Sequence, residues 1–125
     1  MLNDKKAVAT VAVKDLKRAR KFYEDILGLK PIEGDEATAF SYGTAGANVL
    51  VYQSQYAGTN QATAVTWVVG ADLDRIVRDL RAKGVAFEHY DLPGMTRDGD
   101  IHTAGPMRVA WFKDPDGNIH ALGNR

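Results

Sequence analysis

Apolar and polar residues follow the same order in two stretches of the chain. Residues 11–29 read VAVKDLKRARKFYEDILGL, and residues 68–85 read VVGADLDRIVRDLRAKGV. Each stretch begins with β-branched residues typical of a strand, passes through Asp-Leu into a segment with apolar residues at helical spacing, and reaches a Gly followed by an apolar residue. The Asp-Leu pairs begin at Asp15 and Asp72, a period of about 57 residues. We therefore predict one fold built from two equivalent halves.

The first half opens on a strand and a helix. Residues 7–13 (AVATVAV) are small, apolar and β-branched, which predicts a buried strand. Asp15 is expected to cap the helix that follows, because its carboxylate can accept free backbone N–H groups. The apolar stripe of this helix consists of Leu16, Ala19, Tyr23, Ile26 and Leu27. Gly28 is expected to end the helix, since glycine adopts the left-handed conformation readily.

Further strands are expected to complete the first half. Residues 38–42 (TAFSY) and 47–53 (ANVLVYQ) are predicted strands on either side of a glycine-containing turn, and a shorter strand is expected near 30–33. The polar, glycine-containing residues 54–62 (SQYAGTNQA) form the expected linker to the second half.

The second half repeats this order. A strand over 63–69 (TAVTWVV) leads to Asp72, the expected N-cap of a second helix, and a strand over 85–90 (VAFEHY) follows. Residues 91–106 hold Gly, Asp and Pro but few apolar residues, which predicts a long loop.

The chain is expected to close with a hairpin. Strands over 107–113 (MRVAWFK) and 119–122 (IHAL) flank the turn sequence DPDGN at 114–118. Asp114 and Asp116 are expected to bond the backbone of this turn.

Composition narrows the possible function classes. The 125 residues fit a single domain, 1–125, and 45% hydrophobic with 26% charged residues is typical of soluble globular proteins. Sixteen basic and sixteen acidic residues cancel, which argues against a nucleic-acid or anionic-membrane partner. The basic residues within 14–21 are expected to form a solvated helix face. The absence of cysteine excludes disulfides and thiolate chemistry. With no signal-like or membrane-spanning apolar segment, we expect a cytoplasmic protein.

The repeat, the segment FYEDILGL at 22–29 and the turn DPDGN at 114–118 together resemble the vicinal oxygen chelate superfamily, which groups glyoxalase I, bleomycin-resistance proteins and extradiol dioxygenases. The resemblance covers nearly the whole chain. It implies an α+β fold of two βαβββ modules, about 7–53 and 63–122, whose curved mixed sheets form an open cup. It also implies a homodimer.

Metal-dependent members of this superfamily hold a divalent ion with His and Glu side chains from four strand positions that face the cup. By motif spacing, the resemblance places these positions at Val8, Leu50, Val65 and Ala121. None of these side chains can ligate a metal ion, and a shift of one residue adds only His120 and no second imidazole or carboxylate. We therefore expect no metal and no cofactor, and a pocket floor without charge.

Aromatic side chains are expected near this floor. Trp67 lies two residues after Val65, so strand alternation predicts the same face for both. Tyr52 and Asn48 flank Leu50 by the same spacing. Together with Trp111 and Phe40, Trp67 and Tyr52 would stack a flat ligand, with the Tyr52 hydroxyl and Asn48 giving direction. The alternative is that these rings fill the core or a dimer interface.

The three histidines have no spacing typical of a metal site. His89 and His120 adjoin residues expected to face inward, so both are expected to face outward. His102 lies in the predicted loop, where it is either an exposed loop residue or a ligand or proton-transfer contact at the mouth of the cup. Asp98 and Asp100 are expected to lie in a solvated turn.

These patterns favour a binding protein over an enzyme. The first hypothesis is a metal-free, dimeric protein that binds a small aromatic or amphipathic molecule, such as a drug or metabolite. Its expected ligand-binding residues are Asn48, Leu50, Tyr52, Val65, Trp67, His102, Trp111 and Ala121. The alternative is a lyase, isomerase or dioxygenase of the same superfamily, with a displaced metal site or none, in which His102, Tyr52 or an Asp within 91–100 transfers protons. A third reading is a structural or regulatory protein without a small ligand.

Overall fold

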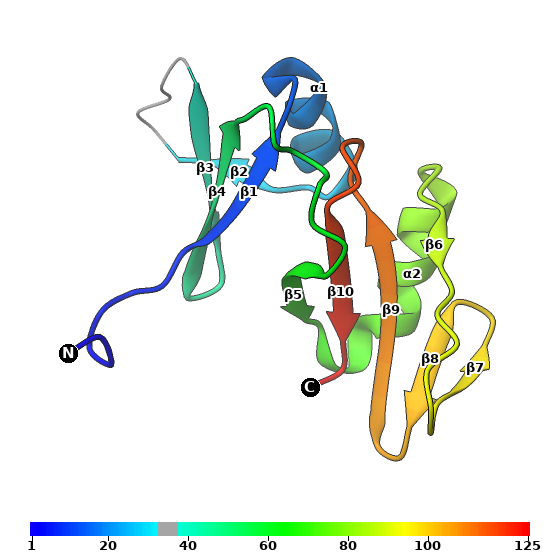
Figure 1. Ribbon diagram of the computed structural model, residues 1–125. Helices are drawn as coiled ribbons and strands as arrows, with labels where there is room; N and C mark the ends of the chain where they lie inside the picture. The colour runs from blue at the N-terminus through cyan, green and yellow to red at the C-terminus, as the bar shows by residue number, and fades with distance from the viewer. Residues whose placement is uncertain (33–37) are drawn as a thin grey trace. The chain divides into compact units, whose positions relative to one another are not determined.

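The repeat in the sequence corresponds to two structural units. The computed structural model describes residues 1–32 and 38–125. Unit 1 comprises Met1–Asn60 and Pro115–Asn118, and unit 2 comprises Gln61–Asp114 and Ile119–Arg125. Each unit has a mixed sheet and a helix between its first two strands, so the predicted α+β fold of two βαβββ-type modules is confirmed (Figure 1).

Unit 1 has a four-stranded sheet with the order β1-β4-β3-β2. Its elements are β1 (Ala9–Val13), α1 (Leu16–Arg20), the π-helical continuation η1 (Lys21–Ile26), β2 (Lys30–Pro31), β3 (Ala39–Thr44) and β4 (Ala47–Gln53). Strands β1 and β4 are parallel, whereas β3 is antiparallel to both β4 and β2. Part of the region between β2 and β3 lies outside the described residues, including the expected strand end at residue 33.

One face of this sheet packs against the helix. The Tyr42 ring stacks on the Tyr23 ring of η1 at 6.0 Å between centroids, and the Tyr42 hydroxyl donates to Glu24 at 2.9 Å. Val49 pairs with Tyr42 in the sheet and is buried. Because side chains alternate along a strand, Asn48 and its neighbours at even positions of β4 lie on the opposite face.

The helix of unit 1 begins as expected. The Asp15 carboxylate accepts the backbone N–H groups of Lys17 and Arg18 at 2.9 and 3.2 Å, which satisfies two of the free donors of the first turn. Gly28 follows the helix with φ of 75°, in the left-handed region that glycine tolerates.

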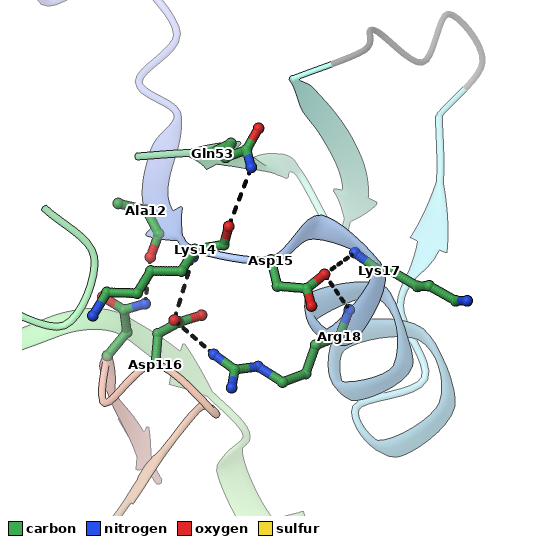
Figure 2. A network of polar contacts seen from close by, with 8 residues as sticks. Ala12, Lys14, Asp15, Lys17, Arg18, Gln53 and Asp116 are labelled. Atoms are coloured by element: carbon green, nitrogen blue, oxygen red, sulfur yellow. Dashed lines mark hydrogen bonds and ion pairs between the residues drawn. The ribbon is translucent and has the colours of Figure 1, made fainter. Parts of the chain in front are cut away.

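The turn over Pro115–Asn118 belongs to unit 1. Figure 2 shows the polar contacts that join this turn to the end of β1 and the start of α1. Asn118 donates to the carbonyl of Ala12 at 2.7 Å, and Asp116 accepts from the Lys14 N–H at 3.3 Å and from Arg18 at 2.8 Å. Beyond the expected role of Asp116 in its turn, its side chain reaches the start of α1. It also changes the interpretation of Arg18, which makes an ion pair rather than belonging to a merely solvated face.

Unit 2 has a six-stranded sheet with the order β5-β10-β9-β8-β7, and β6 pairs with the C-terminal end of β9. Its elements are β5 (Thr63–Val68), the 3-10 turn η2 (Gly70–Asp72), α2 (Leu73–Ala82), β6 (Phe87–Glu88), β7 (Thr96–Asp98), β8 (Ile101–Ala104), β9 (Met107–Lys113) and β10 (Ile119–Gly123). Strands β5 and β10 are parallel, as β1 and β4 are in unit 1.

Unit 2 departs from the sequence prediction at two places. The expected long loop over 91–106 contains the hairpin β7–β8, whose strands are short and joined by a turn at Gly99. The expected cap at Asp72 is absent, because Asp72 lies in η2 and its side chain makes no cap hydrogen bond. Within the described part of the chain, no helix is long and apolar enough to cross a membrane.

Candidate functional site

The two faces of the unit 2 sheet differ in what they contact. Arg108 of β9 makes two 2.9 Å hydrogen bonds to Asp74 of α2, so the face that carries Arg108, Ala110 and Phe112 is the helix side. These bonds raise the pKa of Arg108 and lower that of Asp74. The other face carries Trp111 and Val109, which pair with Ala121 and His102 respectively.

A pocket of about 240 Å³ opens on unit 2 around His102, and we call it the His102 pocket. Its lining consists of His89, Tyr90, Asp91, Met95, Thr96, Arg97 and His102. These residues come from the segment after β6, from the approach to β7 and from β7 and β8 themselves. The hairpin that was predicted as a loop therefore forms much of the pocket wall.

His102 is the most buried member of this lining, with 1% of its surface exposed. Its Nε2 atom accepts the backbone N–H of Tyr90 at 3.0 Å. Of the two alternatives for His102, the exposed loop residue is wrong, because β8 pairs with β9 and turns His102 toward Val109 and Trp111.

Two polar atoms of the pocket wall have no hydrogen-bond partner among the described residues. They are the Nδ1 atom of His102 and the hydroxyl of Tyr90, and both are buried. Leaving a buried polar group without a partner costs about 1–3 kcal/mol, so native proteins retain such groups rarely. Burial is also the main reason why the pKa of Tyr90 is raised, with a smaller contribution from Glu88.

Aromatic rings surround these two atoms. The Trp111 ring lies edge-on to His102 at 4.8 Å and to Tyr90 at 5.1 Å between centroids. Such edge-to-face contacts place the positive rim of one ring against the negative face of another. The sequence pattern identified Trp111 and His102 but missed Tyr90, although Tyr90 ends the predicted strand beside Asp91, where a buried surface gives way to a polar one.

A charged cluster lies at the edge of the pocket. His89 Nε2 lies 2.7 Å from Asp100, and Arg81 of α2 donates to the same carboxylate at 3.0 Å. The hydrogen bond from His89, followed by that from Arg81, lowers the pKa of Asp100. Asp100 is therefore not the solvated turn residue that we expected, because it links α2 to the β7–β8 hairpin.

Trp67 and Val65 lie on the helix side of the unit 2 sheet. Val65 pairs with His120, and the Trp67 indole N–H donates to His120 Nδ1 at 3.0 Å. The prediction that they share a face with Ala121 is wrong, since Ala121 adjoins His120 and points the other way. The 3-10 turn over Gly70–Asp72 separates strand from helix here, so the spacing from Asp72 does not place side chains as the spacing from Asp15 does.

The remaining predicted residues belong to unit 1. Asn48, Leu50 and Tyr52 lie on the sheet face opposite the helix, and Tyr52 is 39% exposed. Of the two alternatives for Phe40, a place in the core is the one that holds. Phe40 pairs with Val51 on the helix side, and the Arg20 guanidinium lies 4.7 Å from its ring centroid.

A larger hollow of about 570 Å³ in unit 1 is lined by Lys14, Gln53, Ser54 and Gln55. It offers no aromatic ring, and the Gln53 amide is already bonded to the carbonyl of Lys14 at 3.2 Å. The His102 pocket is therefore the better candidate for recognition, despite its smaller volume.

The residues at the superfamily's metal positions do not fit a metal ion. Val8, Leu50, Val65 and Ala121 carry no donor atom, and Val65 lies on the opposite sheet face from Ala121. Over residues 1–32 and 38–125, no group of three or more His, Cys, Asp or Glu side chains is arranged to hold a metal ion.

Comparison with known proteins assigns the chain to a family. A family model described as the Glyoxalase/Bleomycin resistance protein/Dioxygenase superfamily matches residues 7–122. No curated protein sequence matches.

Solved structures resemble the chain over almost its full length. An integron cassette protein from the Halifax Harbour sewage outfall metagenome has 18% identity and a TM-score of 0.71, covering 98% of this chain and 99% of that one. Fosfomycin resistance protein FosX from Listeria monocytogenes has 18% identity and a TM-score of 0.68, and the match covers 100% of this chain and 93% of that one. Lactoylglutathione lyase from Agrobacterium tumefaciens has 16% identity and a TM-score of 0.71, and the match covers 98% of this chain and 95% of that one. At these identities the likeness concerns the fold alone. The family match confirms the resemblance found in the sequence, and the chain belongs to the glyoxalase, bleomycin resistance protein and dioxygenase superfamily.

Proposed function

We propose that this protein binds a small aromatic or amphipathic molecule in the His102 pocket, without a metal ion. The observation that carries the proposal is the presence of two buried polar atoms, on His102 and Tyr90, that have no partner among the described residues. Both residues line a pocket and both contact the Trp111 ring. A ligand with an apolar ring and a polar group matches this combination.

The volume of the pocket limits the size of the ligand. A cavity of about 150 Å³ accommodates benzene, whereas pockets for drug-sized ligands begin at about 300 Å³. At about 240 Å³, the His102 pocket suits a single ring with one short substituent. Trp111, His102 and Ala121 share the sheet face that would receive this ring.

The experiment uses the two tryptophans as separate reporters. Trp111 contacts the pocket residues, whereas Trp67 is bonded to His120 on the other face of the sheet. A panel of single-ring aromatic compounds is titrated into the wild-type protein, Trp67→Phe and Trp111→Phe while tryptophan fluorescence is recorded. We expect saturable quenching in the wild type and in Trp67→Phe, and its loss in Trp111→Phe.

Thermal melting of the same samples gives an independent readout, because a ligand that binds only the folded state raises the melting temperature. Saturable quenching confined to Trp67, or neither quenching nor a melting shift with any compound, would contradict the proposal.

We also propose that the protein is a homodimer. Val68 is 71% exposed and lies on β5, the strand at one edge of the unit 2 sheet, and an edge strand can pair with a strand of another chain. Light scattering on the purified chain is expected to give twice the 13.7 kDa chain mass. A monomer at micromolar concentration would contradict this proposal and leave the pocket proposal intact.

A further inference from the structure

The hydrogen bond between Tyr90 and His102 determines which nitrogen of the imidazole carries the proton. Nε2 accepts the Tyr90 backbone N–H, and an amide N–H can only donate. A ring nitrogen that accepts a hydrogen bond carries no proton, so Nε2 is the bare nitrogen in this contact. A neutral imidazole that accepts at Nε2 carries its proton on Nδ1. The buried Nδ1 atom of His102 is therefore a hydrogen-bond donor.

The Tyr90 hydroxyl is a second donor in the same wall. Its burial raises the pKa of the phenol, and the charge of Glu88 adds to this, so the hydroxyl keeps its proton at neutral pH. The oxygen is buried and has no partner among the described residues. The Tyr90 and His102 rings lie 6.4 Å apart between centroids, and both residues line the pocket.

The charges at the pocket wall are mixed. Arg97 and Asp91 both contribute to the lining, and Arg97 also donates to the carbonyl of Gly99 at 2.7 Å. A neutral His102 adds no charge. The wall therefore lacks the cluster of cations that a phosphate or other multivalent anion requires, while two uncharged donors suit an oxygen with available lone pairs.

We propose that the His102 pocket selects single-ring aromatic ligands that carry an acceptor oxygen next to the ring, to which His102 Nδ1–H and Tyr90 O–H donate. This inference rests on the proposed function. Aryl ketones and aromatic carboxylates share this chemistry, and the experiment separates them.

The experiment compares probes of matched shape. Acetophenone and α-methylstyrene differ only by C=O against C=CH₂, and benzoate supplies the charged form of the acceptor. Binding is followed by NMR chemical-shift titration of the isotope-labelled protein. Acetophenone is expected to bind at least about tenfold more tightly than α-methylstyrene, because the hydrocarbon leaves both donors without a partner.

Two variants assign the preference to the donors. Tyr90→Phe removes only the hydroxyl and is expected to weaken acetophenone binding about fivefold while leaving α-methylstyrene unchanged. His102→Gln keeps an acceptor oxygen where Nε2 meets the Tyr90 N–H but removes the Nδ1–H donor, with a similar expected loss. Tyr56→Phe, at a tyrosine that is 69% exposed, is the matched control and should change neither affinity.

The outcomes separate this inference from the proposed function. If acetophenone, benzoate and α-methylstyrene bind equally well, the inference is overturned and the proposed function stands. If none of the three binds, the proposed function itself is contradicted. A preference for benzoate over acetophenone assigns the carboxylate as the acceptor, and the reverse assigns the ketone.

A direct measurement covers the case in which a variant fails to fold. Long-range ¹H–¹⁵N correlation spectra distinguish the two neutral tautomers of His102 in the wild-type protein. The Nδ1–H form is expected, and the Nε2–H form or a charged ring at pH 7 would overturn the inference.

Discussion

Unit 1 and unit 2 both have an Asp-Leu pair and an Arg at the start of their helices, but these side chains make different contacts in the two units. Asp15 caps its helix, whereas Asp72 makes no cap hydrogen bond and lies 3.3 Å from Arg75 at the surface. Arg18 is bonded to the buried carboxylate of Asp116, whereas Arg75, its counterpart by the repeat, pairs among the described residues with the exposed Asp72 and Asp79. A repeat thus predicts which elements form, while the role of each repeated side chain depends on what the surrounding chain provides.

The buried faces of the two sheets differ in the polar side chains that they contain. In unit 1 the described residues of the helix side include the buried phenols of Tyr23 and Tyr42, of which Tyr42 is bonded to Glu24. In unit 2 the corresponding face contains an imidazole, because His120 is fully buried and stacks at 5.0 Å on the Phe112 ring. Unit 2 therefore carries a buried imidazole, whose protonation below neutral pH opposes folding.

The largest expected effect tests the contact that completes unit 1. Gly58 has φ of 75°, and a Cβ there would overlap the backbone carbonyl oxygen of Asp116. Gly58→Ala should therefore displace the turn over Pro115–Asn118 and cost more than about 3 kcal/mol of unfolding free energy. In unit 2, Gly84 has φ of 91° and open space around it, so Gly84→Ala should cost only about 1–2 kcal/mol.

Urea denaturation of both variants measures the difference. Equal costs would show that the contact between Gly58 and the turn does not constrain unit 1, and the distinction drawn between the two units would fail at this point.

The next effect concerns His120. Its burial lowers the pKa from 6.5 to about 4. Between these two pH values, the imidazole of His120 binds a proton in the unfolded chain but not in the folded chain. The stabilisation is complete above pH 6.5 and is lost as the pH falls toward 4, in total about 3 kcal/mol. Urea denaturation between pH 7 and pH 4 measures this loss.

His120→Asn is the matched variant, because the Asn oxygen can accept from the Trp67 indole where Nδ1 does, yet it does not titrate over this range. The loss of stability between pH 6.5 and 4 should be about 3 kcal/mol smaller in His120→Asn than in the wild type. Identical slopes would mean that the imidazole titrates normally and that the core of unit 2 is not a pH-sensitive element.

The paired arginines give a smaller contrast. Arg18→Ala would leave the Asp116 carboxylate, whose side chain is 2% exposed, without its cation, at a cost of about 2 kcal/mol. Arg75→Ala removes only exposed ion pairs and should change stability by less than about 0.5 kcal/mol. Chemical denaturation at low and at high salt measures both. If Arg18→Ala also costs less than about 0.5 kcal/mol, the ion pair with Asp116 is merely a surface contact.

Much of the fold could be predicted because local pattern decides it. The strands over 47–53 and 107–113 have the bounds predicted from apolar and β-branched residues. The hairpin β7–β8 was missed, since its short strands contain few apolar residues and depend on pairing with β9. Periodicity carries no signal for an element that is ordered by its neighbours.

The candidate site could be predicted only in part, for a related reason. Trp111 and Ala121 lie on a long strand pair where alternation holds, so their common face follows from the sequence. The face of Trp67 depends on a 3-10 turn that the Asp-Leu repeat conceals. The pair formed by Tyr90 and His102 is a tertiary contact over 12 residues, and neither residue type indicates it alone.

The smallest effect tests the two caps. Asp15→Ala removes the acceptor of the Lys17 and Arg18 N–H groups and should cost about 1 kcal/mol. Asp72→Ala removes no cap hydrogen bond, so its cost should stay within a few tenths of a kcal/mol. Asp15→Asn, which keeps a side-chain oxygen at the cap, should recover most of the loss and exclude a purely electrostatic cause. Thermal denaturation of the three variants resolves these differences. Equal costs for Asp15→Ala and Asp72→Ala would mean that the two helices begin alike in solution, and that the 3-10 turn does not distinguish unit 2 from unit 1.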